Sequence, residues 1–200
     1  MKVKSGAAWL SAVLILQAGA CAGGNGPEAG SPAATPTSST ATRSASPSDT
    51  RTYASEAGGG FSFSYPSTWR TSAPATGLVE VTVAAPSDGE DDFVPNINVV
   101  IEPLRVDLDA EGYLEASLSA IRSAFNRFEL LDQGGISIDG QAAAWIEYEW
   151  VTNGRKIRQR QVYLTRGDDG FVITFTATPT TFEERLESER LVESTFRFDN

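Results

Sequence analysis

The stretch QAAAWIEYEWVTNGRKIRQRQVYLTR (residues 141–166) decides the fold of this chain. It contains Asn153-Gly154, a dipeptide that strongly favours the type I′ turn of a β-hairpin. A two-residue loop here fixes how residues 141–151 pair with residues 156–166. Two opposite-charge pairs then lie on one face, and apolar side chains share the other. The expected cross-strand pairs are Trp150 with Ile157, Glu149 with Arg158, Glu147 with Arg160 and Trp145 with Val162.

Further strands are predicted on both sides of this hairpin. Aromatic and serine residues alternate over residues 61–65, and valines alternate at residues 79–83. Apolar runs predict two more strands at residues 97–104 and 171–177, and residues 196–198 close the chain as extended structure. The segment between the first helix and the hairpin reads as a strand or a loop.

Two helices complete the expected fold. Asp109 is a good N-cap for the first, in which Leu114, Leu118 and later apolar residues form one stripe. Thr181 to Glu184 form a capping box for the second, at about residues 182–194, although its stripe is imperfect. The order of elements predicts an α+β domain with an antiparallel sheet and packed helices.

The N-terminus has the features of a secretion signal. Lys2 and Lys4 precede an apolar stretch at residues 7–16, which is too short to span a bilayer. Residues 1–20 are therefore predicted to be a signal peptide. Ala18-Gly19-Ala20-Cys21 resembles a bacterial lipobox, which predicts a lipid anchor on Cys21 and a place at the outer face of the cell membrane. Because Ala18 stands where leucine is usual, cleavage by ordinary signal peptidase and a secreted soluble protein remain the alternative.

Residues 21–57 are predicted to be the lipidated N-terminus and a disordered tether. Of residues 22–57, 29 are Ala, Gly, Pro, Ser or Thr. Such a composition buries too little apolar area to offset the entropy of ordering. A single folded domain is therefore expected over residues 58–200.

The composition excludes several kinds of chemistry. The chain has 200 residues, no His and one Cys, which excludes catalytic triads with His, His-ligated metals and Cys-rich metal sites. Its formal net charge of −10 argues against a nucleic-acid partner. No nucleotide-binding or hydrolase fingerprint is present. We therefore predict no cofactor and no metal.

A family resemblance rests on short motifs. GFSFSYPSTW (residues 60–69) resembles the opening of the PsbP, Mog and DcrB superfamily. Gly140, Ala143 and Tyr148, and the closing Ser-Thr-Phe at residues 194–196, are similar too. With the lipobox and tether, the chain most resembles the LpqN/LpqT group of actinobacterial lipoproteins. The resemblance implies an α-β-α sandwich with a non-enzymatic extracytoplasmic binding or accessory role, and it transfers no catalytic residue.

Three charged clusters are candidate sites, and each has a plainer interpretation. The run from Asp88 to Asp92 offers oxygen ligands for calcium, but it fails the EF-hand pattern and fits a solvated loop. Glu147 and Glu149 have a spacing that suits a catalytic pair, but arginine-paired carboxylates are poor general acids. The basic residues of the hairpin suit an anionic ligand or cross-strand pairing. They are Arg155, Lys156, Arg158 and Arg160.

Aromatic residues supply the remaining candidates for ligand contact. They belong either to the core or to a groove between sheet and helix. The five are Trp69, Trp145, Tyr148, Trp150 and Tyr163.

We therefore expect a cell-envelope lipoprotein that is not an enzyme. Its tethered domain would bind an envelope protein partner or a hydrophobic small ligand. The alternatives are a carboxylate-based envelope hydrolase, or a structural or accessory subunit of a transport or secretion complex.

Overall fold

The computed structural model describes residues 49–72, 77–86 and 93–199. The predicted signal peptide, Cys21 and most of the predicted tether lie outside these residues, and so does the whole acidic run from Asp88 to Asp92. Those expectations stay predictions.

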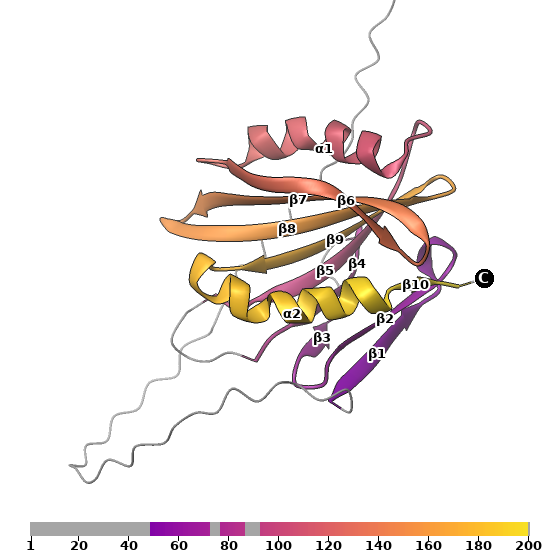
Figure 1. Cartoon of the computed structure of the whole chain (residues 1–200), viewed down its shortest axis with the longest axis horizontal. Coiled ribbons are helices and arrows are strands. Elements are labelled where there is room, and N and C mark those ends of the chain that lie inside the picture. Colours follow the sequence, from indigo (N-terminus) through magenta and orange to yellow (C-terminus); the bar gives the residue numbers. More distant parts are fainter. Residues whose placement is uncertain (1–48, 73–76, 87–92, 200) are drawn as a thin grey trace, which may run out of the picture.

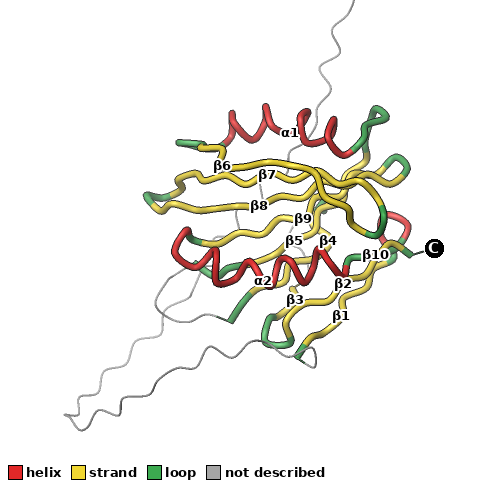
Figure 2. Tube along the Cα trace, in the orientation of Figure 1, coloured by secondary structure: helices red, strands yellow, loops and turns green. Residues whose placement is uncertain are grey.

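The centre of the fold is an antiparallel sheet of seven strands in the order β3-β4-β5-β9-β8-β7-β6 (Figures 1 and 2). A second antiparallel sheet of three strands has the order β1-β2-β10. The strands of the large sheet are β3 (Arg70–Ser72), β4 (Val79–Ala84), β5 (Asn96–Pro103), β6 (Glu129–Ile138), β7 (Gln141–Thr152), β8 (Arg155–Arg166) and β9 (Asp169–Ala177). Those of the small sheet are β1 (Thr50–Ser55), β2 (Phe61–Pro66) and β10 (Arg197–Phe198).

The helices lie on opposite faces of the large sheet, as predicted for an α-β-α sandwich (Figure 1). Helix α1 (Ala110–Ala124) shares one core with Tyr148, Trp150 and Tyr163 of the sheet. Helix α2 (Pro179–Thr195) and the small sheet share the other core, which is rich in phenylalanine. A short 3₁₀ helix, Ala57–Gly59, joins β1 to β2.

The hairpin forms in the predicted register. Asn153 and Gly154 both have positive φ, and all four expected cross-strand pairs are present. The ion pairs, however, are diagonal: Arg158 contacts Glu147, and Lys156 contacts Glu149. Arg160 turns instead to α2. Long side chains reach diagonal neighbours across a sheet, so a correct register did not determine the charge partners.

Two element boundaries differ from the expectation. Strand β1 lies inside the segment that we predicted to be tether, because it pairs with β2 through its backbone and only Tyr53 packs against the core. Residues 129–138, for which a strand and a loop were both open, form strand β6. Helix α2 begins at Pro179 with Thr178 as its N-cap, so the capping box predicted at Thr181 is wrong. The predicted cap of α1 is confirmed, since the Gly112 N–H donates to Asp109 Oδ1 over 2.8 Å.

Candidate functional site

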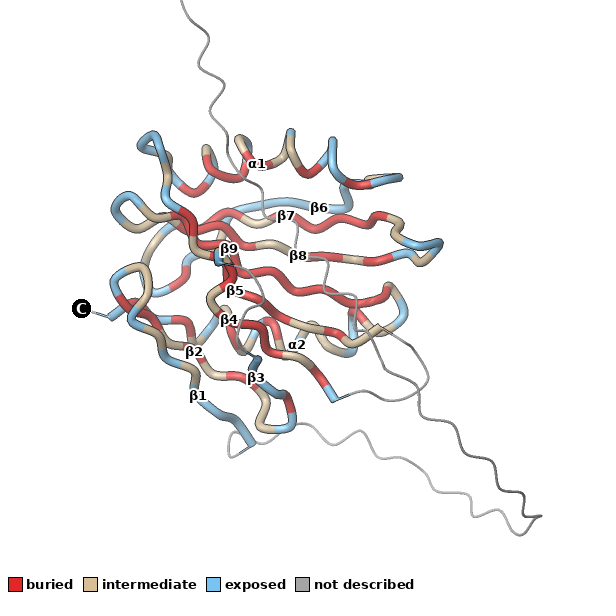
Figure 3. The backbone as a smooth tube through the Cα atoms, turned by 180° about the vertical axis from the view of Figure 1, so that it is seen from behind, coloured by how far each residue is buried: buried red, intermediate tan, exposed pale blue. Residues whose placement is uncertain are grey.

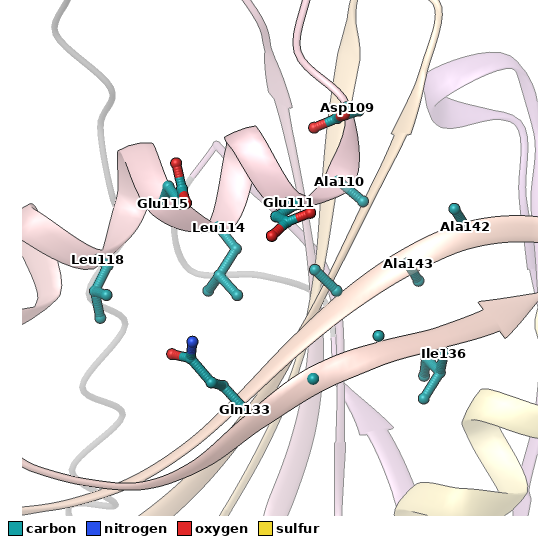
Figure 4. A pocket seen from close by; sticks show the side chains of 13 residues that line it. Asp109, Ala110, Glu111, Leu114, Glu115, Leu118, Gln133, Ile136, Ala142 and Ala143 are labelled. Atoms are coloured by element: carbon teal, nitrogen blue, oxygen red, sulfur yellow. The ribbon is translucent and has the colours of Figure 1, made fainter.

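The main hollow of interest is a groove of about 700 Å³ between α1 and the end of the large sheet. We call it the α1–β6 groove. In Figure 4, Leu114 points from the helix toward the strands, and Gln133 points back from β6. The residues that line it are Asp109, Ala110, Glu111, Leu114, Glu115, Leu118, Gln133, Gly134, Gly135, Ile136, Ala142, Ala143 and Ala144.

The groove forms because small residues occupy the part of the sheet that α1 does not cover. Helix α1 packs mainly over β7 and β8 rather than over β6. Gly135 offers no side chain, and a Cβ added there would meet only the Ala143 carbonyl oxygen at 3.8 Å. On the opposite face, a Cβ at Gly134 would lie 3.1 Å from Nε1 of Trp145, so this indole supports the floor from below.

The rim of the groove is acidic. Asp109, Glu111 and Glu115 are exposed on the first turns of α1, where the helix dipole favours negative charge. The ion pairs found among residues 49–72, 77–86 and 93–199 include none of these three carboxylates. The groove therefore combines an apolar floor with carboxylates that have no ion-pair partner among the described residues.

Strand β6 adds an open edge to the groove. It is the last strand of the sheet, it is 10 residues long, and Figure 3 shows it exposed beside its buried neighbours. Within the part of the chain that the structure describes, its outer edge has no strand partner. A bulge between Leu130 and Asp132 interrupts one end. Such an edge presents backbone donors and acceptors to another extended chain.

The five predicted aromatic residues do not line this groove. Four of them are at most 6% exposed, and the rings are parts of the two cores. Trp145 is only partly buried, and the Arg160 guanidinium lies 4.0 Å from its ring centre. These rings are therefore core residues in the folded state, and a ligand role for Trp69, Trp145, Tyr148, Trp150 or Tyr163 stays a prediction.

The charged residues of the hairpin are engaged with one another and with α2. Glu147 accepts from Arg158, which also contacts Glu183, and Glu149 contacts Lys156. Arg155 interacts as well. This arrangement matches the plainer interpretation of both clusters, in which charges pair across strands.

Sequence reasoning missed Glu189, which is fully buried between α2 and the sheet. Arg160 Nε lies 3.1 Å from Glu189 Oε1 and 3.1 Å from Glu193 Oε1. Burial, reinforced by the neighbouring Glu193 carboxyl, raises the pKa of Glu189 to about 9. The hint in the sequence is its spacing, because residue 189 falls on the same helical face as Phe182 and Val192.

A second buried polar contact ties α1 to the sheet. The Tyr113 hydroxyl donates to Glu102, and burial raises the pKa of that carboxyl. Tyr113 also lies edge-on to Tyr163, with ring centres 5.1 Å apart. These groups are enclosed beneath the helix, so we assign them to packing.

Two kinds of feature were not found among the described residues: a membrane-spanning helix and a metal-binding cluster. None of their helices is long and apolar enough to cross a bilayer. They also contain no cluster of three or more acidic or thiol side chains arranged to hold a metal ion.

Comparison with known proteins supports the fold. The family model described as DcrB matches residues 62–192, well over half of the chain. A curated relative, effector EagT6 of Pseudomonas aeruginosa, is 31% identical over 67 residues, which is 34% of this chain and 46% of that protein. The chain thus aligns with about half of that relative's length.

Solved structures extend the likeness at the level of fold. The cyanobacterial PsbP of Synechocystis sp. PCC 6803 has a TM-score of 0.56 and 16% identity, over 79% of this chain and 99% of that one. LpqN of Mycobacterium tuberculosis gives 0.56 and 13%, over 74% and 90%. The Ran-binding protein Mog1p of Saccharomyces cerevisiae gives 0.52 and 9%, over 74% and 95%. The predicted superfamily and α+β fold are confirmed, while membership of the LpqN/LpqT group stays a prediction.

Proposed function

Because the chain belongs to the DcrB family, we propose that it is a non-enzymatic accessory protein of the bacterial cell envelope that holds a protein partner in the α1–β6 groove. The observation that carries this proposal is a groove of about 700 Å³ that has an apolar floor, an acidic rim and an open strand edge. Within the superfamily we place the chain nearest the LpqN/LpqT lipoproteins, on the strength of the lipobox and the composition of residues 22–57.

The partner that fits is an extended segment with basic side chains. Backbone groups of such a segment would pair with the outer edge of β6, as in strand addition. Side chains alternate along a strand, so apolar ones would meet Leu114, Leu118 and the alanines of the floor. Basic ones on the same segment would meet Glu111 and Glu115, which have no basic partner among the described residues.

The groove favours binding over hydrolysis. Glu111 and Glu115 are four residues apart on α1 and both line the groove, but both are exposed. A general acid needs a raised pKa, which burial or a neighbouring charge must provide. The most deeply buried carboxylate, Glu189, lies on the other face of the sheet against Arg160.

The named relatives support a role in protein assembly. Mog1p is described as Ran-binding, LpqN as involved in cell envelope biogenesis, and EagT6 as an effector. These descriptions concern those proteins. They support for this chain a binding or accessory role at the envelope.

The groove is tested with synthetic peptides and the full chain. We expect an alternating Lys-Val hexapeptide to bind, and an alternating Glu-Val hexapeptide to bind at least tenfold more weakly, in a fluorescence anisotropy titration. Glu111→Lys with Glu115→Lys should abolish binding of the Lys-Val peptide. The matched control is Glu184→Lys with Glu187→Lys, which makes the same charge change on exposed positions of α2.

A steric variant separates the groove from simple charge attraction. Gly135→Leu puts a side chain into open space without a positive φ, so the fold should survive. This variant should weaken the Lys-Val peptide at least tenfold although no charge changes. Equal binding by the wild type, Gly135→Leu and the α1 charge-reversal variant would refute the groove as the site.

The anchor is tested separately. Metabolic labelling with a fatty-acid analogue should modify the wild-type chain and leave Cys21→Ser unlabelled. Equal labelling of both chains would refute the lipid anchor, and the protein would then be a secreted soluble one.

A further inference from the structure

A second hollow lies at the opposite end of the molecule from the α1–β6 groove. It has a volume of about 480 Å³ and is lined by Arg51, Ser67, Thr68, Trp69, Arg70 and Thr71. The strands that form it, β1 and β3, lie at one end of the molecule in Figures 1 and 3, and α1 lies at the other. We call this hollow the arginine pocket.

The backbone that shapes the arginine pocket is fixed. Trp69 is 2% exposed and anchors the turn between β2 and β3 in the core. The Trp69 N–H donates to the Pro66 carbonyl over 2.9 Å, and the Ser67 N–H donates to the Asp49 carbonyl over 2.7 Å. The pocket therefore joins the two sheets, with Arg51 from the small one and Arg70 from the large one.

Both arginines are free to bind a ligand. They are exposed, and the ion pairs found among the described residues include neither of them. Glu80 of β4 faces β1, but it already accepts hydrogen bonds from Tyr53 and Ser55. In a chain with a net charge of −10, two guanidinium groups that have no ion-pair partner among the described residues are a local exception to the charge of the molecule.

We propose that the arginine pocket binds a phosphate ester, and that the headgroup of an anionic phospholipid is its source. Two guanidinium groups offer planar pairs of donors that match phosphate oxygens. Ser67, Thr68 and Thr71 also line the pocket, and each carries a hydroxyl whose hydrogen can rotate toward an acceptor. A carboxylate has only two oxygens and would leave part of this donor set unused. The volume leaves room for the esterified group as well as the phosphate.

The position of the pocket favours a lipid over a free phosphate ester. Strand β1 begins at Thr50, beside the pocket, and Cys21 precedes it in the sequence. A chain anchored through Cys21 would enter the folded domain at this end. A headgroup bound there would present the α1–β6 groove away from the membrane. The anchor through Cys21 and this orientation of the groove both rest on the proposed function, whereas the donor set of the pocket does not.

The test uses the full mature chain with Cys21→Ser, so that no acyl chain contributes to membrane binding. Vesicles of phosphatidylglycerol and phosphatidylcholine, and vesicles of phosphatidylcholine alone, are sedimented with the protein at low salt. A parallel NMR titration with glycerol 3-phosphate, and one with acetate, report binding of soluble anions. The pocket variant is Arg51→Gln with Arg70→Gln. The matched control is Arg105→Gln with Arg190→Gln, which removes the same charge from exposed positions elsewhere.

We expect the pocket variant to lose at least tenfold in affinity for the phosphatidylglycerol vesicles, and the control less than twofold. Glu111→Lys with Glu115→Lys should retain the pocket's binding of glycerol 3-phosphate, which distinguishes failure at this site from failure at the groove. Binding of glycerol 3-phosphate without binding of vesicles supports the pocket and assigns a soluble phosphate ester as its ligand. Equal losses in the two arginine double variants, an equal response to acetate, or no binding of either phosphate probe would overturn the proposal.

Discussion

Helices α1 and α2 cover opposite faces of one sheet, but different forces hold them there. Helix α1 buries a continuous apolar stripe that includes Tyr113, Leu114 and Ile121, and Asp109 caps its N-terminus. Helix α2 buries Phe182 and Val192, with an acidic residue between them on the same face. The first helix is attached by apolar burial, whereas the second also depends on an ion-pair cluster.

The difference has an energetic consequence. Burial of apolar side chains stabilises a helix without any cost of desolvating charges. A buried ion pair, in contrast, must compensate for the desolvation of both charges. Arg160 contacts the carboxyl groups of Glu189 and Glu193 and the ring of Trp145, and these contacts offset the desolvation of its guanidinium group. We infer that the cluster fixes how α2 sits on the sheet more than it adds to the free energy of unfolding. Removing one member should nonetheless be severe, because the others remain buried.

The largest effect is expected from Arg160→Ala. This substitution leaves the Glu189 and Glu193 carboxyl groups without their hydrogen-bond donor and uncovers Trp145, so the free energy of unfolding should fall by about 3–5 kcal/mol. Denaturant titration followed by tryptophan fluorescence measures the loss. Arg190→Ala, at an exposed position of α2, should change stability by less than about 0.5 kcal/mol. A loss below about 1 kcal/mol at Arg160 would show that α2 does not need the cluster.

Gly170→Ala tests the attachment of α1. A Cβ at this position would lie 2.7 Å from Cε1 of Tyr113 and 2.9 Å from Cδ2 of Leu104. The ring must move, which disturbs its hydrogen bond to Glu102, so we expect a loss of about 1–3 kcal/mol by thermal or chemical denaturation. Gly77→Ala is the control, since a Cβ there has no neighbour within 4 Å. Equal stability of the two variants would contradict the close packing of α1.

Glu189→Gln should flatten the dependence of stability on pH. The folded protein holds a proton on this carboxyl up to a pKa of about 9, whereas the unfolded chain releases it near the ordinary glutamate pKa of 4.5. Stability from this group is therefore complete below the unfolded pKa and falls as pH rises toward 9, by at most about 1.4 kcal/mol per pH unit. The glutamine variant should lack this fall in urea titrations at pH 5 and pH 8. Parallel curves for wild type and variant would mean that Glu189 is ionised in the folded state.

The smallest effect is expected at the start of α1. Asp109→Ala removes the acceptor for the Gly112 N–H and should cost about 1 kcal/mol. Asp107→Ala, two residues earlier and exposed, should have little effect in the same assay. If both substitutions cost the same, general charge near the helix terminus, rather than the cap, would stabilise α1.

The same contrast explains which parts of the molecule could be predicted. The hairpin register followed from Asn153-Gly154 because a two-residue turn leaves no freedom in pairing. Helix α1 followed from its stripe and its cap. Strand β1 was missed because its polar side chains carry little pattern and its pairing with β2 is made by the backbone. The start of α2 was misplaced because Thr181 to Glu184 have the sequence of a capping box, whereas the helix begins two residues earlier, at Pro179.

The candidate sites depended more on tertiary structure. The aromatic residues looked like ligand contacts, but residue type alone does not say whether a ring faces a core or a groove. The α1–β6 groove is built mainly from glycine, alanine and surface carboxylates, and these residue types form no motif that would mark a binding site in a sequence. Nothing in the order of residues suggests that Arg51 and Arg70, from two different sheets, line one pocket.

The sequence by itself determined the α+β class, the central hairpin, the capped first helix and the absence of His-based chemistry. These features depend on neighbouring residues, whose periodicity and turn preferences act over short distances. Only the tertiary structure decided which charges pair, which rings are buried, and where the groove and the arginine pocket form. Those outcomes depend on the packing of elements far apart in the chain, because a charge takes its partner from whichever element folding brings within reach.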